Sequence, residues 1–283
     1  MYTSRMRASR AFEGKRVVLT GAASGIGRAL ALDLASRGAH LALTDVDARG
    51  LEAVSREVRL RGHEPSVHVA DLADGPAVER LAEETRAALG HVDLLVNNAG
   101  VSVVSPLSST TESDWSWVTG VNLWGPIRLT RALLPGMIAR GSGRIVVTAS
   151  LAGLVGAPGM VAYSTTKFAM VGFAESLRHE VEAHGIGVTV VCPGYVRTGL
   201  HAATRYHNEG FARFLSKPPR WYGVSAERAA ERILQGVARR RSLVTIGPEK
   251  TGWLLKRLSP ELAFEVTHWV ARRTGILRQG VEP

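Results

Sequence analysis

Short apolar runs alternate with helical stretches along most of the chain. Each run is rich in Val, Leu or Ile, which is typical of buried strands. Strands that alternate with helices form a parallel sheet covered on both faces, and right-handed crossovers wind that sheet in two directions. The pattern therefore predicts an α/β, three-layer, doubly wound fold with a mainly seven-stranded parallel sheet. We expect strands at residues 16–20, 39–44, 66–70, 92–96, 143–149, 186–192 and 243–246.

Glycine and polar residues stand where the predicted strands end. In doubly wound sheets, ligands bind at the carboxyl ends of the strands. We therefore expect the residues at these ends to surround one site. They are Gly21, Asp45, Asp71, Asn97, Ser150 and Pro193, for the first six strands in order.

A glycine-rich turn, Gly21-Ala-Ala-Ser-Gly-Ile-Gly27, separates the first strand from a helical stretch that extends to Arg37. Glycine permits positive φ and lets the backbone approach a pyrophosphate, whose charge is met by amide N–H groups and the positive end of the helix. Asp45 lies eighteen residues past Gly27, where a carboxylate accepts hydrogen bonds from ribose hydroxyls and repels a 2′-phosphate. These features favour NAD over NADP; an Asx turn is the alternative role of Asp45.

Tyr163 and Lys167 are four residues apart, so on a helix they share one face. A nearby cation stabilises a phenolate and lowers the phenol pKa from its usual value of about 10. A tyrosine of this kind can exchange protons near neutral pH. The spacing occurs by chance on many helices, but beside a dinucleotide site it indicates an acid/base catalyst.

These motifs, in this order, resemble the short-chain dehydrogenase/reductase family, with its TGxxxGxG, NNAG and Ser-Tyr-Lys pattern. The resemblance covers residues 14 to about 247 and implies a Rossmann-fold catalytic domain there. It leaves a basic N-terminal tail at 1–13 and a C-terminal extension at 248–283. The matching segments are Thr20–Gly27, Asp71-Leu72, Asn97–Gly100, Asn122, Ser150, Tyr163–Lys167, and Pro193-Gly194 with Thr198.

The family resemblance implies reversible hydride transfer between nicotinamide and a secondary alcohol or ketone. Tyr163 is expected to carry the proton, Ser150 to hold the substrate oxygen, Lys167 to assist Tyr163 and bind ribose, and Asn122 to support a water chain to the lysine. Asn97 is expected to help hold the central strand. The cofactor contacts implied are Gly21, Ser24, Gly25, Ile26, Gly27, Asp45, Asp71, Leu72, Asn98, Ala99, Gly100, Tyr163, Lys167, Pro193, Gly194, Val196 and Thr198. Family members that prefer NADP usually carry a basic residue where this chain has Ser24 or Val46.

The substrate is expected to meet segments after the fourth, fifth and sixth strands, including Val101–Val104 and a lid at about 199–223. The lid aromatics Tyr206, Phe211, Phe214, Trp221 and Tyr222 favour a bulky apolar alcohol or ketone of steroid, retinoid, fatty or aromatic type, although they could simply pack the lid. Arg205, Arg213, Lys217 and Arg220 leave an acidic substrate as the alternative. We expect substrate contacts at Ser150, Leu151, Met160, Tyr163 and Tyr195.

The net charge of +10 is concentrated at the two ends of the chain. Residues 1–16 carry five basic and one acidic side chain, and residues 239–283 carry nine and four. A nucleic-acid groove would need this excess on the body, so we expect no nucleic-acid partner. Two amphipathic helices with basic and tryptophan residues, broken at Ser259-Pro260, suit an anionic membrane surface, a subunit contact or packing on the body.

The remaining composition fits a cytoplasmic protein, with peripheral membrane contact as an option. The chain has no spanning apolar run and no apolar leader segment. Cys192, the single cysteine, cannot form an intrachain disulfide and is expected to be a buried thiol. The nine histidines show no metal-ligand spacing, so we expect no metal.

Three functional alternatives follow from these observations. The first is an NAD(H)-dependent alcohol dehydrogenase or carbonyl reductase, and the second is an NADP(H)-dependent carbonyl reductase. The third is a non-catalytic NAD(H)-binding sensor or membrane-associated binding protein. The resemblance also implies a homodimer or homotetramer, paired through helices around 112–139 and 162–184.

Overall fold

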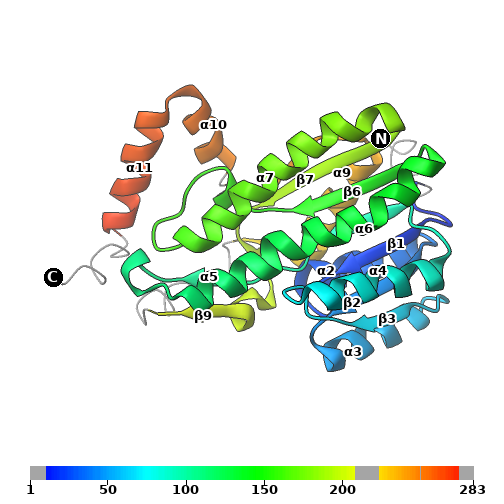
Figure 1. Cartoon of the computed structure of the whole chain (residues 1–283). Helices are drawn as coiled ribbons and strands as arrows, with labels where there is room; N and C mark the ends of the chain where they lie inside the picture. The colour runs from blue at the N-terminus through cyan, green and yellow to red at the C-terminus, as the bar shows by residue number, and fades with distance from the viewer. Residues whose placement is uncertain (1–10, 208–222, 249, 274–283) are drawn as a thin grey trace.

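The computed structural model describes residues 11–207, 223–248 and 250–273. Its centre is a seven-stranded sheet in which every neighbouring pair is parallel, in the order β11-β7-β6-β4-β1-β2-β3 (Figure 1). The predicted doubly wound α/β fold is confirmed. The strands are β1 Arg16–Thr20, β2 His40–Asp45, β3 Ser66–Val69, β4 Leu94–Asn97, β6 Gly143–Thr148, β7 Ile186–Pro193 and β11 Leu243–Ile246.

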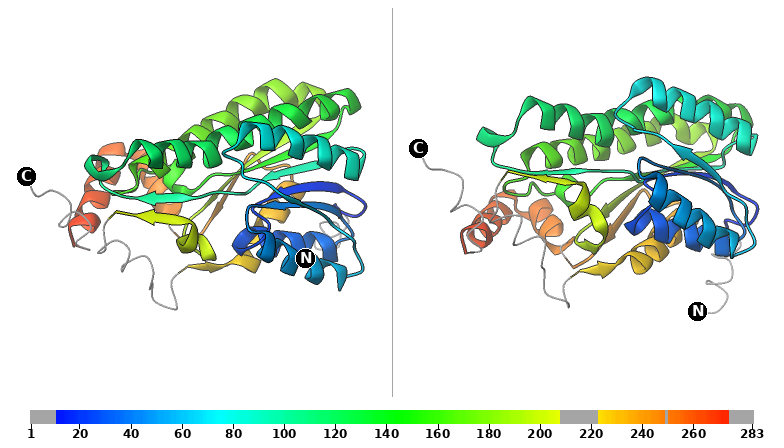
Figure 2. Two further views of the ribbon diagram at one scale, coloured as in Figure 1. Left: turned by 60° about the horizontal axis from the view of Figure 1, so that its bottom comes forward. Right: turned by 90° about the horizontal axis from the view of Figure 1, so that it is seen from below.

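Helices cover both faces of the sheet (Figure 2). One hydrophobic cluster joins the sheet to α2 (Gly25–Ser36), α3 (Ala48–Arg59) and α9 (Ala226–Ala238), and the other joins it to α4 (Gly75–Leu89), α6 (Gly125–Arg140) and α7 (Val161–Val181). Successive strand residues point to opposite faces, so Val17 and Leu19 belong to the first cluster and Val18 to the second. The sheet is thus buried on both sides, which explains its continuous apolar strands.

The strand order reverses beside β1, whose neighbours are β2 on one side and β4 on the other. The loops that leave these strands diverge to opposite faces and open a crevice at their carboxyl ends. Asp45, Asn97 and Pro193 are the last residues of their strands. The fold therefore brings the polar strand ends to one edge of the sheet, as the sequence predicts.

Several short elements near this edge were not predicted. β5 (Ser102–Val104) pairs with β9 (Thr204–Tyr206), and β8 (Val196–Arg197) pairs with β10 (Val224–Ser225). Each pairing spans only two or three residues, too few to show an alternating pattern in the sequence. Helix α5 (Glu112–Thr119) continues into a π-helical turn, Gly120–Trp124, before α6 begins.

The two ends of the described chain differ from one another. Phe12, which we placed in the tail, packs in the core under the Arg37 guanidinium, 5.8 Å from its ring centroid. At the other end, α10 (Lys250–Leu258) and α11 (Pro260–Arg273) project from the body (Figure 1). Among the described residues, no helix combines the length and apolar character needed to cross a membrane.

Candidate active site

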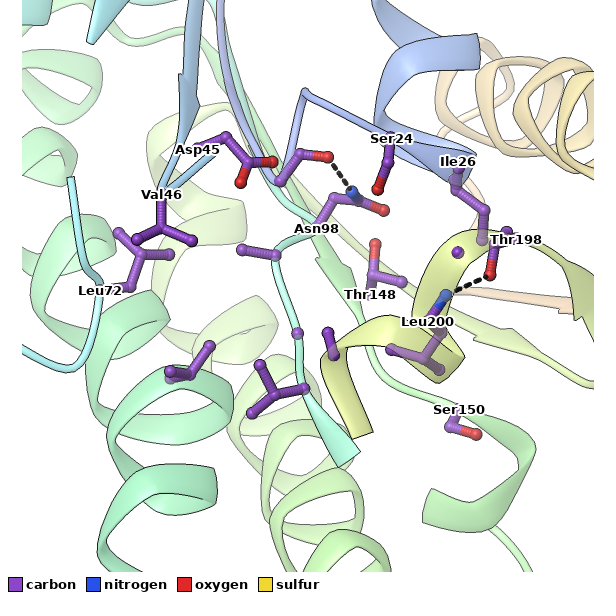
Figure 3. Close-up of a pocket in the computed structure, with 18 of the residues that line it drawn as sticks. Ser24, Ile26, Asp45, Val46, Leu72, Asn98, Thr148, Ser150, Thr198 and Leu200 are labelled. Atoms are coloured by element: carbon purple, nitrogen blue, oxygen red, sulfur yellow. Dashed lines mark hydrogen bonds between the residues drawn. The ribbon is translucent and has the colours of Figure 1, made fainter. Parts of the chain in front are cut away.

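A cavity of about 480 Å³ lies at the carboxyl ends of the parallel strands. Its size is in the usual range for ligand sites. Residues from the loops after six strands line it, so segments far apart in the chain meet there (Figure 3). The predicted residues that line it are Gly21, Ser24, Gly25, Ile26, Asp45, Asp71, Leu72, Asn98, Ala99, Gly100, Ser150, Tyr163, Lys167, Pro193, Gly194, Val196 and Thr198.

The glycine-rich turn depends on residues without a side chain. Gly21 and Gly25 have φ of +67° and +52°, which other residues rarely adopt. A Cβ on Gly21 would lie 2.7 Å from Ala99 Cα. Gly27 does not line the cavity; a Cβ there would lie 1.8 Å from the Gly21 carbonyl oxygen, so its role is close packing of α2 against the turn.

Thr20 and Asn98 lock the glycine turn to the loop after β4. The buried Thr20 hydroxyl accepts hydrogen bonds from the backbone N–H of Asn98 (3.0 Å) and Ala99 (3.1 Å). In return, the Asn98 amide donates to the carbonyl oxygens of Thr20 and Gly21 at 3.2 and 3.3 Å. Asn98 is therefore a brace of the cavity wall, a role that its place in the motif did not reveal.

Asp45 is fixed at the cavity rim by backbone donors. Its Oδ2 accepts from Ala23 N–H at 2.9 Å, and its Oδ1 accepts from Asp47 N–H at 3.1 Å. The second bond is the Asx turn that we considered as the alternative role. Both roles are compatible, because the turn holds the carboxylate beside the exposed Val46 on the cavity wall.

Unsatisfied polar groups in the cavity fit a nicotinamide dinucleotide. Ser24 is the N-cap residue of α2, but its side chain makes no capping hydrogen bond. It therefore accepts no hydrogen bond from the first backbone N–H groups of the helix. Buried Oγ1 atoms of Thr44 and Thr148, which line the cavity, also have no partner. A phosphate at the helix start and polar groups near the two threonines would satisfy them.

Tyr163 and Lys167 lie one helical turn apart on α7, and both are buried, with 7% and 4% of their surface exposed. The lysine Nζ lies 5.6 Å from the phenol ring centroid and donates to Thr148 O at 3.1 Å. Burial lowers the pKa of Lys167 to about 8. This pair therefore forms a proton-handling group in the cavity lining with little exposure to solvent.

The prediction that the pKa of Tyr163 is lowered is wrong. Burial raises the pKa of the phenol, and the Ser150 hydroxyl acts in the opposite direction. The lysine ammonium is directed to the Thr148 carbonyl rather than to the phenol oxygen, which explains why burial prevails. Tyr163 is therefore protonated at neutral pH, in the state needed to donate a proton.

Ser150 follows β6, and its hydroxyl is held by backbone groups. Its Oγ accepts from Ala152 N–H at 3.1 Å and lies 3.5 Å from the Pro193 carbonyl oxygen. It faces the same cavity as Tyr163. The hydroxyl is thus positioned by the chain beside the phenol that it influences.

Asn122 does not line the cavity. Its Oδ1 accepts from Val101 N–H at 2.9 Å, and its Nδ2 donates to Val101 O at 2.9 Å and Thr166 Oγ1 at 3.1 Å. A Cβ on Gly100 would lie 3.3 Å from both Asn122 Oδ1 and Lys167 Nζ. Asn122 therefore joins the loop after β4 to α7 behind the lysine, as a positioning residue.

The predicted substrate contacts are only partly brought to the cavity. Ser150 and Tyr163 line it, whereas Leu151, Met160 and Tyr195 do not. Leu151 instead packs in the core. Lining residues that the sequence analysis did not single out are Thr44, Ala70, Trp117, Val121, Thr148 and Ala149. Helical spacing could have linked Trp117 to Val121, because residues four apart share one face of a helix, and Val121 directly precedes Asn122.

The described part of the predicted lid lies at the cavity. Residues 199–207 form a 3₁₀ turn, Gly199–Ala203, and strand β9, and the turn contributes Gly199, Leu200, Ala202 and Ala203 to the cavity wall. Arg205 pairs with Asp114, with 3.1 Å between NH1 and Oδ1, which weakens the case for this arginine as an anchor for an acidic substrate. Phe211, Arg213, Phe214, Lys217, Arg220, Trp221 and Tyr222 lie outside the described residues.

Cys192 is buried, as expected, and burial raises the pKa of its thiol to about 12. It is therefore unsuited to act as a nucleophile at neutral pH. In the part of the chain that the structure describes, no group of three or more His, Cys, Asp or Glu residues could hold a metal ion.

Comparison with known proteins agrees with this geometry. A family model described as short chain dehydrogenase matches residues 15–209. SadH of Mycobacterium tuberculosis, named as an oxidoreductase, is 39% identical over 244 residues, covering 84% of this chain and 88% of its own. Among solved structures, a short chain dehydrogenase/reductase from Burkholderia phymatum in complex with NAD is similar with a TM-score of 0.83 and 34% identity, over 89% of this chain and 95% of its own. A metagenomic short-chain oxidoreductase in complex with NADP has a TM-score of 0.71 and 31% identity, over 84% and 98%.

Proposed function

The chain belongs to the short-chain dehydrogenase family of oxidoreductases, and on that basis we propose that it is an NAD(H)-dependent enzyme interconverting a secondary alcohol and a ketone. The observation that carries the proposal is the meeting of Ser150, Tyr163 and Lys167 in the cavity that also holds the glycine turn and Asp45. A sensor that only bound the cofactor would have no need of this buried proton-handling group.

The side chains divide the work of the proposed reaction. Bound NAD(H) would supply or accept the hydride. In the reductive direction Tyr163 donates its phenol proton to the substrate oxygen, and in the oxidative direction it accepts the hydroxyl proton. Ser150 donates a hydrogen bond to the same oxygen and holds it against the phenol. Lys167 supports the phenolate that forms and would also hold the nicotinamide ribose.

The glycine turn, Ser24 and Asp45 would hold the adenosine half of the cofactor, and the ordered carboxylate supports NAD over NADP. We expect kcat/KM with NAD to exceed that with NADP by at least about tenfold, because Asp45 opposes a 2′-phosphate. In Asp45→Asn, the amide oxygen can still accept one backbone hydrogen bond while the charge is removed, so the preference should narrow. Steady-state kinetics with both cofactors measures this, and a wild-type preference for NADP would refute the assignment.

A neutral, bulky substrate fits the uncharged part of the cavity lining. Val101, Trp117, Val121, Leu200 and Ala203 line the cavity without a charge among them. Burying apolar surface against such a wall favours steroid-, retinoid-, fatty- or aromatic-type carbinols over sugars or hydroxy acids. The test is turnover of a panel of apolar and acidic ketones of matched size; faster turnover of the acids would overturn this substrate class.

The C-terminal helices support the proposal of peripheral contact with an anionic membrane. Helices α10 and α11 carry five basic and two acidic residues, a combination that suits anionic headgroups. Leu258 is 86% exposed and Trp269 is 55% exposed. The exposed large apolar side chains of these helices are Leu254, Leu258, Leu262, Phe264, Val266 and Trp269.

We expect the protein to co-sediment with anionic vesicles and not with neutral ones. The double variant Leu262→Asp/Trp269→Asp should lose most of this binding, because both side chains are exposed and the change removes apolar area while adding negative charge. Leu60→Asp, at an exposed leucine after α3, is the matched control and should bind like wild type. Equal binding by the double variant, or a changed oligomeric state without any vesicle binding, would refute membrane contact.

A homodimer or homotetramer formed through α5, α6 and α7 remains part of the proposal. Trp124, before α6, and Val161 and Phe168, on α7, are exposed apolar side chains on these helices. A cytoplasmic location also stays a prediction.

A further inference from the structure

Asp114 is a buried carboxylate that the proposed reaction does not use. It lies in the first turn of α5 and is 2% exposed. Its Oδ2 accepts from Thr111 N–H at 3.0 Å and from Thr111 Oγ1 at 2.7 Å, completing a capping box. Burial alone would raise the pKa of this carboxyl, but the hydrogen bonds from Thr111 and Arg205 hold it at about 2. The carboxylate is therefore charged at neutral pH and needs partners.

Those partners come from a segment about ninety residues later in the chain. Arg205 NH1 lies 3.1 Å from Oδ1, and His207 Nε2 lies 2.8 Å from Oδ2. The backbone is held as well, because β9 pairs with β5 and His207 N–H donates to Val104 O at 3.1 Å. One buried carboxylate thus fastens two basic side chains to the body of the protein.

This attachment continues into the cavity wall. The Arg205 guanidinium carbon lies 4.1 Å from the ring centroid of Trp117, and the indole lines the cavity. The turn directly before β9 contributes Leu200, Ala202 and Ala203 to the same wall. Asp114, Arg205 and Trp117 therefore connect α5 to the segment 199–207 at the apolar side of the cavity.

We propose that Asp114 is a positioning residue that fastens segment 199–207 over the cavity through Arg205 and His207, so that Trp117 and the Gly199–Ala203 turn form a fixed apolar wall. The arrangement selects substrates with a neutral, flat or bulky apolar body, because the arginine next to the wall is neutralised by Asp114 and its planar face is covered by the indole. This inference deepens the proposed function, and the kinetic test of the inference rests on that function.

The kinetic test compares Asp114→Asn, Arg205→Met and Arg205→Lys. Arg205→Met leaves the capping box intact, so it separates fastening of the segment from stability of α5. We expect KM for an apolar ketone to rise in Asp114→Asn and Arg205→Met. The rise should be limited to roughly tenfold, because Arg205 is 41% exposed and water screens its pairing with Asp114. The kcat value and the NADH dissociation constant should stay near wild type, since these residues do not touch the reacting atoms. Arg205→Lys keeps the charge and should recover part of the change.

An unchanged KM in Arg205→Met would overturn the inference. A parallel loss of kcat and NADH affinity would also overturn it, because such a loss indicates general destabilisation.

A second measurement needs no turnover. Trypsin should cleave after Arg205 roughly tenfold faster in Asp114→Asn than in wild type, because the carboxylate no longer holds the Arg205 side chain. Peptide mass analysis locates the cut. Equal rates would contradict the fastening role, whereas absence of turnover in wild type with accelerated cleavage in Asp114→Asn would contradict the proposed function alone.

Discussion

Tyr163→Phe is expected to lower kcat by roughly 10²–10⁴-fold while NADH binds with nearly wild-type affinity. The change removes one oxygen from a side chain that is 7% exposed, so the ring still fills its place in the core. No other phenol in the described chain lines the cavity to replace the lost proton donor. Initial rates and a fluorescence titration with NADH measure the two effects separately.

Tyr195→Phe is the matched control for this experiment. It removes the same atom from a phenol outside the cavity, and it should turn over substrate like wild type. Near-normal turnover in Tyr163→Phe would show that the proton comes from another group. Loss of turnover in both variants would restore the sequence-based expectation that Tyr195 contacts the substrate.

Lys167→Met is expected to abolish measurable turnover and, unusually for an active-site change, to stabilise the ligand-free protein. Burial lowers the pKa of this lysine from 10.5 to about 8, so the folded chain holds an ammonium that it disfavours at neutral pH. The shift corresponds to about 3 kcal/mol, and loss of the hydrogen bond to Thr148 O offsets about 1 kcal/mol of it. We therefore expect a net gain of about 2 kcal/mol in the free energy of unfolding at pH 7.

The pH dependence of this gain has a defined sign. Below pH 8 both folded and unfolded lysine are protonated, so the advantage of Lys167→Met is complete. Between pH 8 and 10.5 the folded wild-type chain releases the proton before the unfolded chain does, and wild type becomes more stable relative to the variant. Denaturant unfolding at several pH values measures the difference. A destabilised variant at pH 7 would show that the ammonium is better satisfied in the folded chain than its hydrogen bond to Thr148 O indicates.

Much of the fold could be predicted because parallel strands are buried on both faces. Runs such as Arg16–Thr20 and Leu243–Ile246 are mainly apolar, and their bounds matched the structure. The starts predicted at 66, 143 and 186 also matched, and the remaining strand ends shifted by one or two residues, since a polar residue such as Asp45 can close a strand as readily as follow it. β5 and β9 could not be predicted, because their pairing depends on tertiary contacts such as the Asp114–Arg205 bond.

In the site as in the fold, features that depend on local sequence could be predicted, and features that depend on contacts between distant segments could not. The glycine turn, Ser150, Tyr163 and Lys167 could be predicted because each belongs to a motif with its own spacing. The raised pKa of Tyr163 could not, because it depends on how completely the phenol is buried and on where the lysine ammonium points. The bracing role of Asn98 and the packing role of Gly27 likewise depend on atoms of other loops.

Isotope transfer is the most direct test of hydride transfer coupled to a proton from Tyr163. The protein is incubated with an apolar ketone and NADH that carries deuterium at the transferable position of nicotinamide, and the product is examined by mass spectrometry. We expect an alcohol with deuterium on the carbinol carbon, formed by wild type and Tyr195→Phe and not by Tyr163→Phe. NADH that binds but is never consumed, across apolar ketones and the reverse reaction with alcohols and NAD, would contradict it and favour a cofactor-binding sensor.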